Sequence, residues 1–170
     1  MASQNSKVIG LAIASAVGGF LFGFDSSVVN GAIDAIKSDF ALGDALLGIT
    51  VAIALLGCAV GAFIAGRLAD RLGRIPVMLI GSGLFVVSAI AAGLATEVGV
   101  LIVARVVGGL GIGIASVIAP AYIAEISPAG IRGRLGSLQQ LAITVGIFAA
   151  LLSDAVFAGL AGGESQPLWF

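Results

Sequence analysis

Long apolar stretches alternate with short polar junctions along the whole chain. Five stretches carry few charges, and each is long enough to cross a hydrocarbon core of about 30 Å at a rise of about 1.5 Å per residue. The pattern predicts five spanning helices, at about 8–32, 46–66, 75–95, 99–124 and 134–160. The final residues, 166–170, end in aromatic side chains typical of a membrane interface, so we expect a sixth span to follow.

The composition supports an all-α membrane protein. Of the 170 residues, 59% are hydrophobic and only 10% are charged, whereas a soluble domain carries about 25% charged residues. The chain therefore has too few charges to cover a surface that faces water. The lipid bilayer is the expected partner, and no nucleic-acid partner is expected. Glycine contributes 26 residues, which favours close packing between membrane helices.

The basic residues predict the orientation. Six of them fall on one side of the predicted spans: Lys7, Arg67, Arg71, Arg74, Arg132 and Arg134. Lys37 falls on the other side, among aspartates. Because cytoplasmic loops carry an excess of Lys and Arg, we expect a multi-pass protein of the cytoplasmic membrane with its N-terminus in the cytoplasm.

Catalytic and metal chemistry have little support in the sequence. Histidine is absent and Cys58 is the single cysteine, which excludes His-based proteolysis, His metal sites and an internal disulfide. No cofactor and no metal site are expected, and an intramembrane enzyme is disfavoured.

A charged run separates the second and third predicted spans. Between Gly66 and Arg74 it places Arg67, Asp70 and Arg71, with Gly73 near its end. The alternation of glycine with charged residues predicts a tight, hydrogen-bonded loop whose charges hold the neighbouring helix ends.

Two charges lie deep inside predicted spans, Asp25 in the first and Arg105 in the fourth. Each costs about 2.5–3.5 kcal/mol at a helix centre. Asp25 lies roughly 25 Å above the inner end of its span, and Arg105 about 9 Å below the outer surface. In a core of about 30 Å these heights agree within one helical turn, so the two side chains are expected to pair. Such a pair is either structural or a proton site, because the neighbouring cation favours the carboxylate whereas desolvation opposes it. Asp154 lies about 20 residues along the fifth predicted span, so we expect it near the outer interface at a solvated end.

Amide side chains open the fifth predicted span. Gln140 shares a helical face with Ile143, Thr144 and Ile147, whereas Gln139 is expected to point about 100° away. An amide both donates and accepts hydrogen bonds, which suits sugar hydroxyls. A packing role between helices is the alternative for either glutamine.

Glycine pairs four residues apart recur at Gly19/Gly23, Gly57/Gly61 and Gly109/Gly113. Helix packing is their expected role. The run Gly18–Gly23 also echoes Gly108–Gly113, which is compatible with a repeat of three helices, a known construction in transporters.

Four motifs occur in order and together resemble the sugar porter family of the major facilitator superfamily. They are Gly18–Asp25, the Gly66–Arg74 run, Arg105 followed by Gly108 and Gly109, and the stretch Pro120–Gly133 with Tyr122, Glu125, Pro128 and Arg132. The resemblance covers the whole chain and implies the helical bundle of the superfamily's N-terminal half, without its sixth helix and its C-terminal half. It also implies transport of a hexose or pentose by alternating access.

The resemblance implies roles for individual residues. Asp25 would be the proton-coupling carboxylate and Arg105 its partner, and an acid at this position favours symport over facilitation. The implied sugar-binding residues are Gln140, Phe22, Ile143 and Ile147. The implied cytoplasmic gate comprises Gly66, Arg67, Asp70, Arg71, Gly73, Arg74, Glu125 and Arg132. The implied partners are a sugar, protons and the missing C-terminal half.

Two alternatives remain open at the level of the sequence. A proton-independent sugar facilitator is one, and a non-transporting membrane sensor or scaffold of the same fold is the other. Five helices offer only one wall of a cavity, so we expect that the 170 residues alone do not transport.

Overall fold

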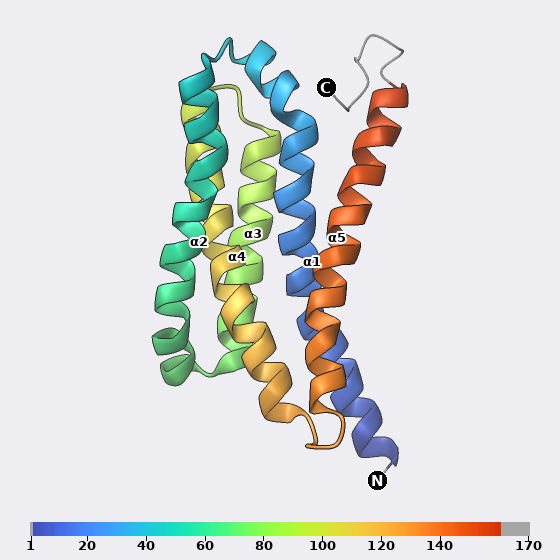
Figure 1. Cartoon of the computed structure of the whole chain (residues 1–170). Coiled ribbons are helices and arrows are strands. Elements are labelled where there is room, and N and C mark those ends of the chain that lie inside the picture. Colours follow the sequence, from blue (N-terminus) through green and yellow to red (C-terminus); the bar gives the residue numbers. More distant parts are fainter. Residues whose placement is uncertain (1, 161–170) are drawn as a thin grey trace.

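The computed structural model describes residues 2–160 as a bundle of long α-helices (Figure 1). The elements are α1 (Ala2–Asp39), α2 (Asp44–Leu72), α3 (Arg74–Gly93), α4 (Val98–Ile126) and α5 (Arg132–Leu160). All five are long and apolar enough to cross a membrane, as the hydropathy pattern predicts. The aromatic ending at 166–170 lies outside the described residues.

The charged run Gly66–Arg74 is helical except at Gly73, contrary to the loop that the sequence predicts. α2 continues to Leu72 and α3 begins at Arg74, so that Gly73 alone connects the two helices. Gly73 has φ +89°, a left-handed conformation that glycine adopts without steric cost, and its N–H still bonds the carbonyl of Ala69 at 2.9 Å. The helix persists because Arg and Leu are good helix formers, and only the glycine reverses the chain.

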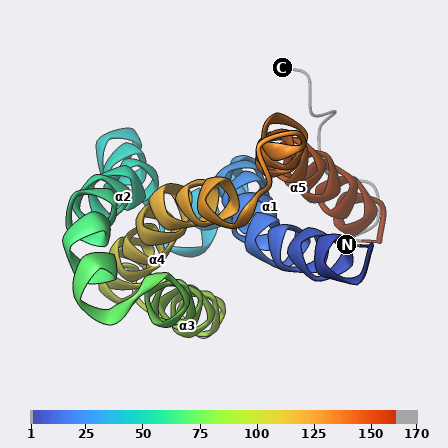
Figure 2. The same ribbon diagram turned by 90° about the horizontal axis from the view of Figure 1, so that it is seen from below.

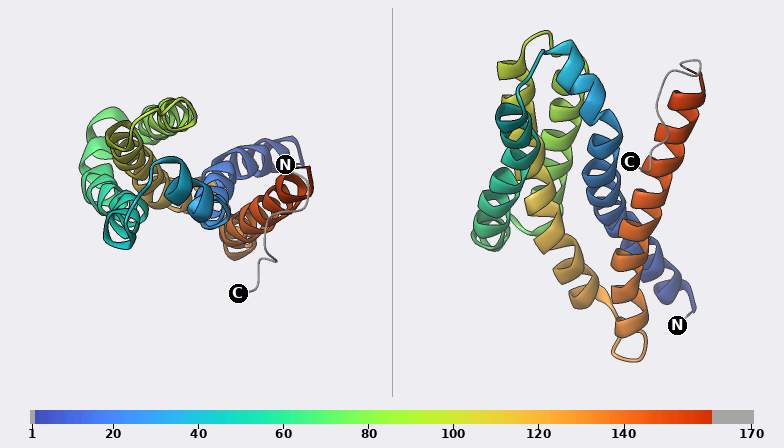
Figure 3. Two further views of the ribbon diagram at one scale, coloured as in Figure 1. Left: turned by 90° about the horizontal axis from the view of Figure 1, so that it is seen from above. Right: turned by 45° about the horizontal axis from the view of Figure 1, so that its top comes forward.

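The helices form two groups joined along one seam. α4 packs between α2 and α3, while α1 packs against α5, and contact between α1 and α4 joins the groups. The end-on views show α2, α3 and α4 together and α1 beside α5 (Figures 2 and 3). The α2–α3 and α4–α5 junctions share one end of the bundle (Figure 1). We call this end, which carries Arg67, Arg71, Arg74, Arg132 and Arg134, the basic end.

The paired glycines lie where helix backbones meet, which confirms their packing role. A Cβ atom on Gly57 or Gly61 of α2 would overlap a carbonyl of α4, and one on Gly109 or Gly113 of α4 would overlap a carbonyl of α2. Glycine thus allows these two backbones to approach more closely than any side chain would permit.

The glycine contacts recur in matching register, which supports a three-helix repeat. In one group the contacts are Gly19 with Gln139, Gly23 with Ile143 and Gly146 with Phe20; in the other they are Gly109 with Ala54, Gly113 with Cys58 and Gly61 with Leu110. Adding 90 to a residue number in α1 gives its counterpart in α4, and subtracting 85 from one in α5 gives its counterpart in α2. The α1–α5 pair therefore repeats the α4–α2 pair.

Candidate functional site

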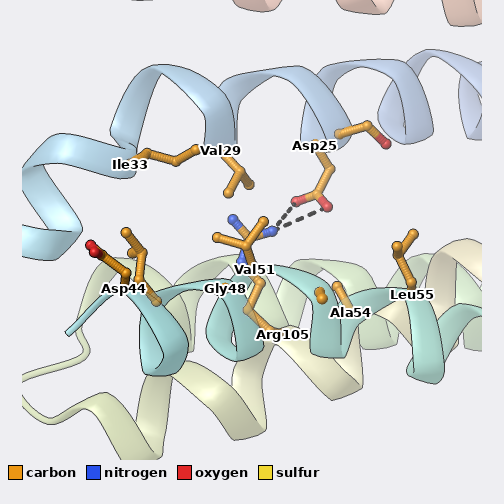
Figure 4. A pocket seen from close by; sticks show the side chains of 12 residues that line it. Asp25, Val29, Ile33, Asp44, Gly48, Val51, Ala54, Leu55 and Arg105 are labelled. Carbon is orange, nitrogen blue, oxygen red and sulfur yellow. Dashed lines mark hydrogen bonds and ion pairs between the residues drawn. The ribbon is translucent and has the colours of Figure 1, made fainter. Parts of the chain in front are cut away.

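An ion pair joins α1 to α4 within the bundle. Arg105 Nη1 lies 3.3 Å from Asp25 Oδ1 and 3.3 Å from Oδ2, and the two side chains are only 15% and 25% exposed. The side chain of Arg105 reaches from α4 across to the carboxylate on α1 (Figure 4). The pairing that the two depths predict is confirmed.

The ion pair separates two pockets. One, of about 470 Å³, lies between α1 and α2 and extends from Asp25 and Arg105 to Asp44 (Figure 4). The other, of about 390 Å³, lies between α1 and α3, where Phe85 and Ser88 border it. Both pockets are otherwise mostly apolar, apart from Ser26 and Asp44 in the first and Ser88 in the second. The Asp25 carboxylate and the Arg105 guanidinium border both, so a proton or water in either pocket would meet them.

A third pocket, of about 360 Å³, lies between α4 and α5 and brings most of the expected sugar-binding residues together. Phe22, Ser116, Pro120, Gly136, Gln139, Gln140 and Ile143 border it. Gln140 is exposed and borders this space. Ile147, one turn beyond Ile143, lies outside this lining; its backbone packs against α1 at Gly23, and its side chain is 40% exposed.

Gln139 also borders the pocket, although its expected direction lay 100° away from the sugar-binding face. Its side chain is 9% exposed, and its Oε1 atom is buried without a hydrogen-bond partner among the described residues. A step of one residue along a helix rotates the direction of the Cβ by about 100°, but the long side chain of a glutamine at the rim can still border the pocket. The hydropathy pattern does not show whether it does.

The α1–α2 and α4–α5 pockets occupy equivalent places in the repeat. The α2 positions Val51, Ala54 and Leu55 that border the first correspond, by the shift of 85, to Gly136, Gln139 and Gln140 of the third. The polar residues are thus distributed unequally between two related pockets. One holds the ion pair, and the other holds two amides.

Charged side chains join helices at the basic end. Arg74, at the start of α3, pairs with Glu125 of α4 at 3.0 Å between Nη2 and Oε1, and with Asp70 of α2 at 3.6 Å between Nη1 and Oδ1. Three helices therefore meet at one guanidinium. Arg74 is 29% exposed and Glu125 is 49% exposed, so this is a water-accessible junction rather than a buried one.

The other expected gate residues surround this junction without joining it. Arg67 lies over the ring of Phe63, 5.2 Å from its centroid. Arg132 donates from Nη2 to the carbonyl of Ser127 at 3.3 Å. Gly66 has open space at its Cβ position, and Arg71 is exposed.

Asp154 of α5 has a different environment from the solvated end that its height in the span suggests. A Cβ atom on Gly31 of α1 would overlap its carboxylate, so the acid lies against the α1 backbone and is only partly exposed.

A family model described as "Sugar (and other) transporter" matches residues 11–169, nearly the whole chain. The chain belongs to the sugar transporter family. This family comprises transporters rather than enzymes, in agreement with the sequence-based expectation, and its sugar porters have the major facilitator superfamily fold.

Relatives within the sugar transporter family carry several sugars. A "Glucose transport protein" of Synechocystis is 56% identical over 155 residues, which cover 91% of this chain and 33% of that protein. An "Arabinose-proton symporter" of Bacillus subtilis is 41% identical over 142 residues, which cover 84% of this chain and 31% of that protein. The chain thus spans about a third of the length of these relatives.

Solved structures of the family superpose closely on the bundle. The xylose transporter XylE from E. coli, in a partially occluded inward-open conformation, matches with a TM-score of 0.84 at 29% identity, covering 95% of this chain and 43% of that one. A structure of the XylE proton:xylose symporter with a bound bromodeoxyglucose matches with a TM-score of 0.80 at 33% identity, covering 97% of this chain and 40% of that one. The expected superfamily fold is therefore confirmed.

Proposed function

We propose that the chain is the proton-coupling and gating part of a sugar transporter, which moves a hexose or pentose together with protons by alternating access. The observation that carries this proposal is the Asp25–Arg105 pair, which borders two pockets within the bundle. Relatives that transport arabinose or xylose with protons support the coupled mode.

A carboxylate in this position can bind and release a proton because its charged form depends on one partner. Arg105 stabilises the Asp25 carboxylate, while the surrounding apolar groups oppose charge. When the carboxylate binds a proton, the ion pair weakens and the α1–α4 seam loses a constraint. Proton occupancy and helix arrangement are therefore coupled through these two residues.

The α4–α5 pocket supplies a wall for the sugar. Gln140 offers both a donor and acceptors to hydroxyl groups, and Phe22 and Ile143 offer apolar surface to the sugar ring. These helices supply one wall, and the rest of the carrier supplies the opposing wall. Ile147 lies one turn beyond Ile143 on the same helix and is 40% exposed.

The basic end serves as the inner gate. The pairs that Arg74 makes with Asp70 and Glu125 hold α2, α3 and α4 together there. Exposed pairs contribute about 0–1 kcal/mol each, a magnitude that a cycle can break and restore. The five arginines at this end support a cytoplasmic location for it and for the N-terminus, because cytoplasmic loops carry an excess of Lys and Arg. The proposed carrier lies in the cytoplasmic membrane.

The carrier reconstituted in lipid vesicles tests the proposal. With an acidic exterior, it should concentrate a labelled hexose or pentose, and a protonophore should abolish the concentration. Asp25→Asn should still exchange labelled for unlabelled sugar but should not concentrate it. Asp154→Asn is the matched control, because it neutralises another carboxylate within a span, and it should concentrate sugar normally.

Other outcomes identify the alternatives. Sugar that equilibrates without being concentrated in the unaltered carrier would indicate a facilitator. Sugar that binds without crossing would indicate a sensor or scaffold. Concentration by Asp25→Asn would overturn the assigned role of this carboxylate.

A further inference from the structure

Gln139 of α5 is a buried polar side chain that borders the α4–α5 pocket. It is 9% exposed, and its Oε1 atom has no hydrogen-bond partner among the described residues. An unpaired amide atom that is removed from water carries a free-energy cost. Exchanging the nitrogen and oxygen of the amide would leave the NH₂ group in that place instead. A ligand in the adjoining pocket would supply the missing partner once the amide turns toward it.

The amide of Gln139 packs against α1, but the packing does not require an amide. Gln139 lies where α5 meets Gly19 of α1: a Cβ on Gly19 would stand 2.8 Å from the Gln139 carbonyl and 2.9 Å from its Nε2. The equivalent contact in the repeat joins Gly109 to Ala54. There a methyl group suffices for the same backbone approach. The long polar side chain at position 139 is thus an addition that the packing does not require.

A proline in α4 removes a helical hydrogen-bond donor beside the same pocket. Pro120 stands inside α4 and has no N–H, so the carbonyl of Ser116, four residues earlier, lacks its helical donor. The Ser116 hydroxyl does not supply that donor, because it donates to the carbonyl of Gly113 at 2.8 Å. Ser116, Pro120 and Gln139 all border the α4–α5 pocket, together with Gln140.

We infer that Gln139 is a second sugar-binding amide of this pocket and determines which hydroxyl pattern the carrier accepts. This inference rests on the proposed function. The final torsion of a glutamine side chain is broad, so the amide can turn toward the pocket and exchange hydrogen bonds with a hydroxyl group. The Ser116 carbonyl accepts from a hydroxyl on the facing side. Gln139 and Gln140 then contact different hydroxyls, because successive residues project in different directions.

Deoxy-sugars test the inference in the reconstituted carrier. KM is measured for the preferred sugar and for analogues that each lack one hydroxyl, with the unaltered carrier, Gln139→Ala and Gln140→Ala. Gln139→Ala reproduces the residue at the equivalent position of α2, so it should fold. Leu141→Met, on an exposed position of the same helix, is the control for substitution in α5, and each variant is normalised to the amount of folded protein.

We expect Gln139→Ala to raise KM for the parent sugar by about three- to tenfold, the range for one uncharged hydrogen bond. For one deoxy analogue, KM should be the same with and without the substitution, because the hydroxyl that Gln139 binds is absent. Gln140→Ala should also raise KM for the parent sugar, but the analogue for which it leaves KM unchanged should lack a different hydroxyl.

A KM that is unchanged, or that rises by the same factor for the parent and every analogue, would overturn the inference. Normal sugar transport by the unaltered carrier in that experiment would leave the proposed function standing. If the unaltered carrier moves none of the sugars, the proposed function itself fails, and this role of Gln139 fails with it.

Discussion

Ser88 of α3 donates a 2.8 Å hydrogen bond to the carbonyl of Ala104, the residue directly before Arg105 in α4. The bond is buried and joins two helices. The Ser88 hydroxyl also occupies the space that a Cβ on Gly108 would need, so the two helices are held at close range beside the ion pair. α3 thereby fixes the turn of α4 from which Arg105 reaches Asp25.

Ser88→Ala removes this bond without leaving a buried donor unpaired. We expect it to lower the free energy of unfolding by about 0.6 kcal/mol, and at most by about 1.7 kcal/mol, as found for hydrogen bonds between membrane helices. Thermal unfolding of the purified carrier measures the change. Ser82→Ala is the control, because the Ser82 hydroxyl donates to the carbonyl of Met78 in its own helix and to no other helix among residues 2–160. An equal effect of the two substitutions would contradict the bridging role.

Asp25 and Arg105 should be energetically coupled. Arg105→Met leaves the partly buried Asp25 carboxylate without its cation, and Asp25→Asn leaves the Arg105 guanidinium without its anion. Loss of one partner from a buried pair costs about 3–5 kcal/mol. The double variant leaves neither charge, so it should be destabilised by less than the sum of the single variants. A coupling free energy of about 0.5–3 kcal/mol is expected. Strict additivity in the unfolding free energies would show that the pair makes no net contribution.

Gly113 and Gly83 provide a matched test of the α2–α4 contact. A Cβ at position 113 would overlap the carbonyl of Cys58, whereas nothing lies within 4 Å of a Cβ at position 83. Gly113→Ala should therefore destabilise the carrier by about 1–3 kcal/mol through overpacking. Gly83→Ala should be neutral or stabilising by about 0.5–1 kcal/mol, because alanine is the better helix former. A neutral Gly113→Ala in thermal unfolding would show that the two backbones do not meet as described.

The sequence predicts the helices and the ion pair well because both depend on fixed helix geometry. Apolar length identifies a span, and rise per residue sets the depths of Asp25 and Arg105. The ends of the helices are less predictable. The Gly66–Arg74 run reads as a loop from its charges, yet its arginines prolong α2 and only Gly73 reverses the chain.

The α4–α5 pocket could be predicted only in part. Phe22, Gln140 and Ile143 follow from the family motifs and border the pocket, whereas Gln139 does not follow from any of them. Periodicity gives the direction of its Cβ, but it does not show how far the amide reaches or whether it finds a partner. The repeat could have drawn attention to it, because Gln139 stands where the other half has Ala54.

Breaking the Arg74–Glu125 pair should favour the state that is open at the basic end. The pair is partly exposed and is worth about 0–1 kcal/mol, so Glu125→Gln should raise the population of that state by up to about fivefold. The alkylation rate of a cysteine introduced by Ser116→Cys, in a Cys58→Ser background, reports access to the pocket from that end. Arg134→Gln removes an exposed charge at the same end and should leave the rate unchanged. A slower rate with Glu125→Gln would contradict a closing role for the pair.

Proton movement that accompanies sugar movement tests the central claim most directly. When the preferred sugar is added to vesicles that contain the carrier, without an imposed pH gradient, the external medium should become more alkaline as protons enter with the sugar. Asp25→Asn should abolish the pH change while sugar exchange continues. Sugar entry without any pH change in the unaltered carrier, or an undiminished pH change in Asp25→Asn, would contradict proton coupling through Asp25.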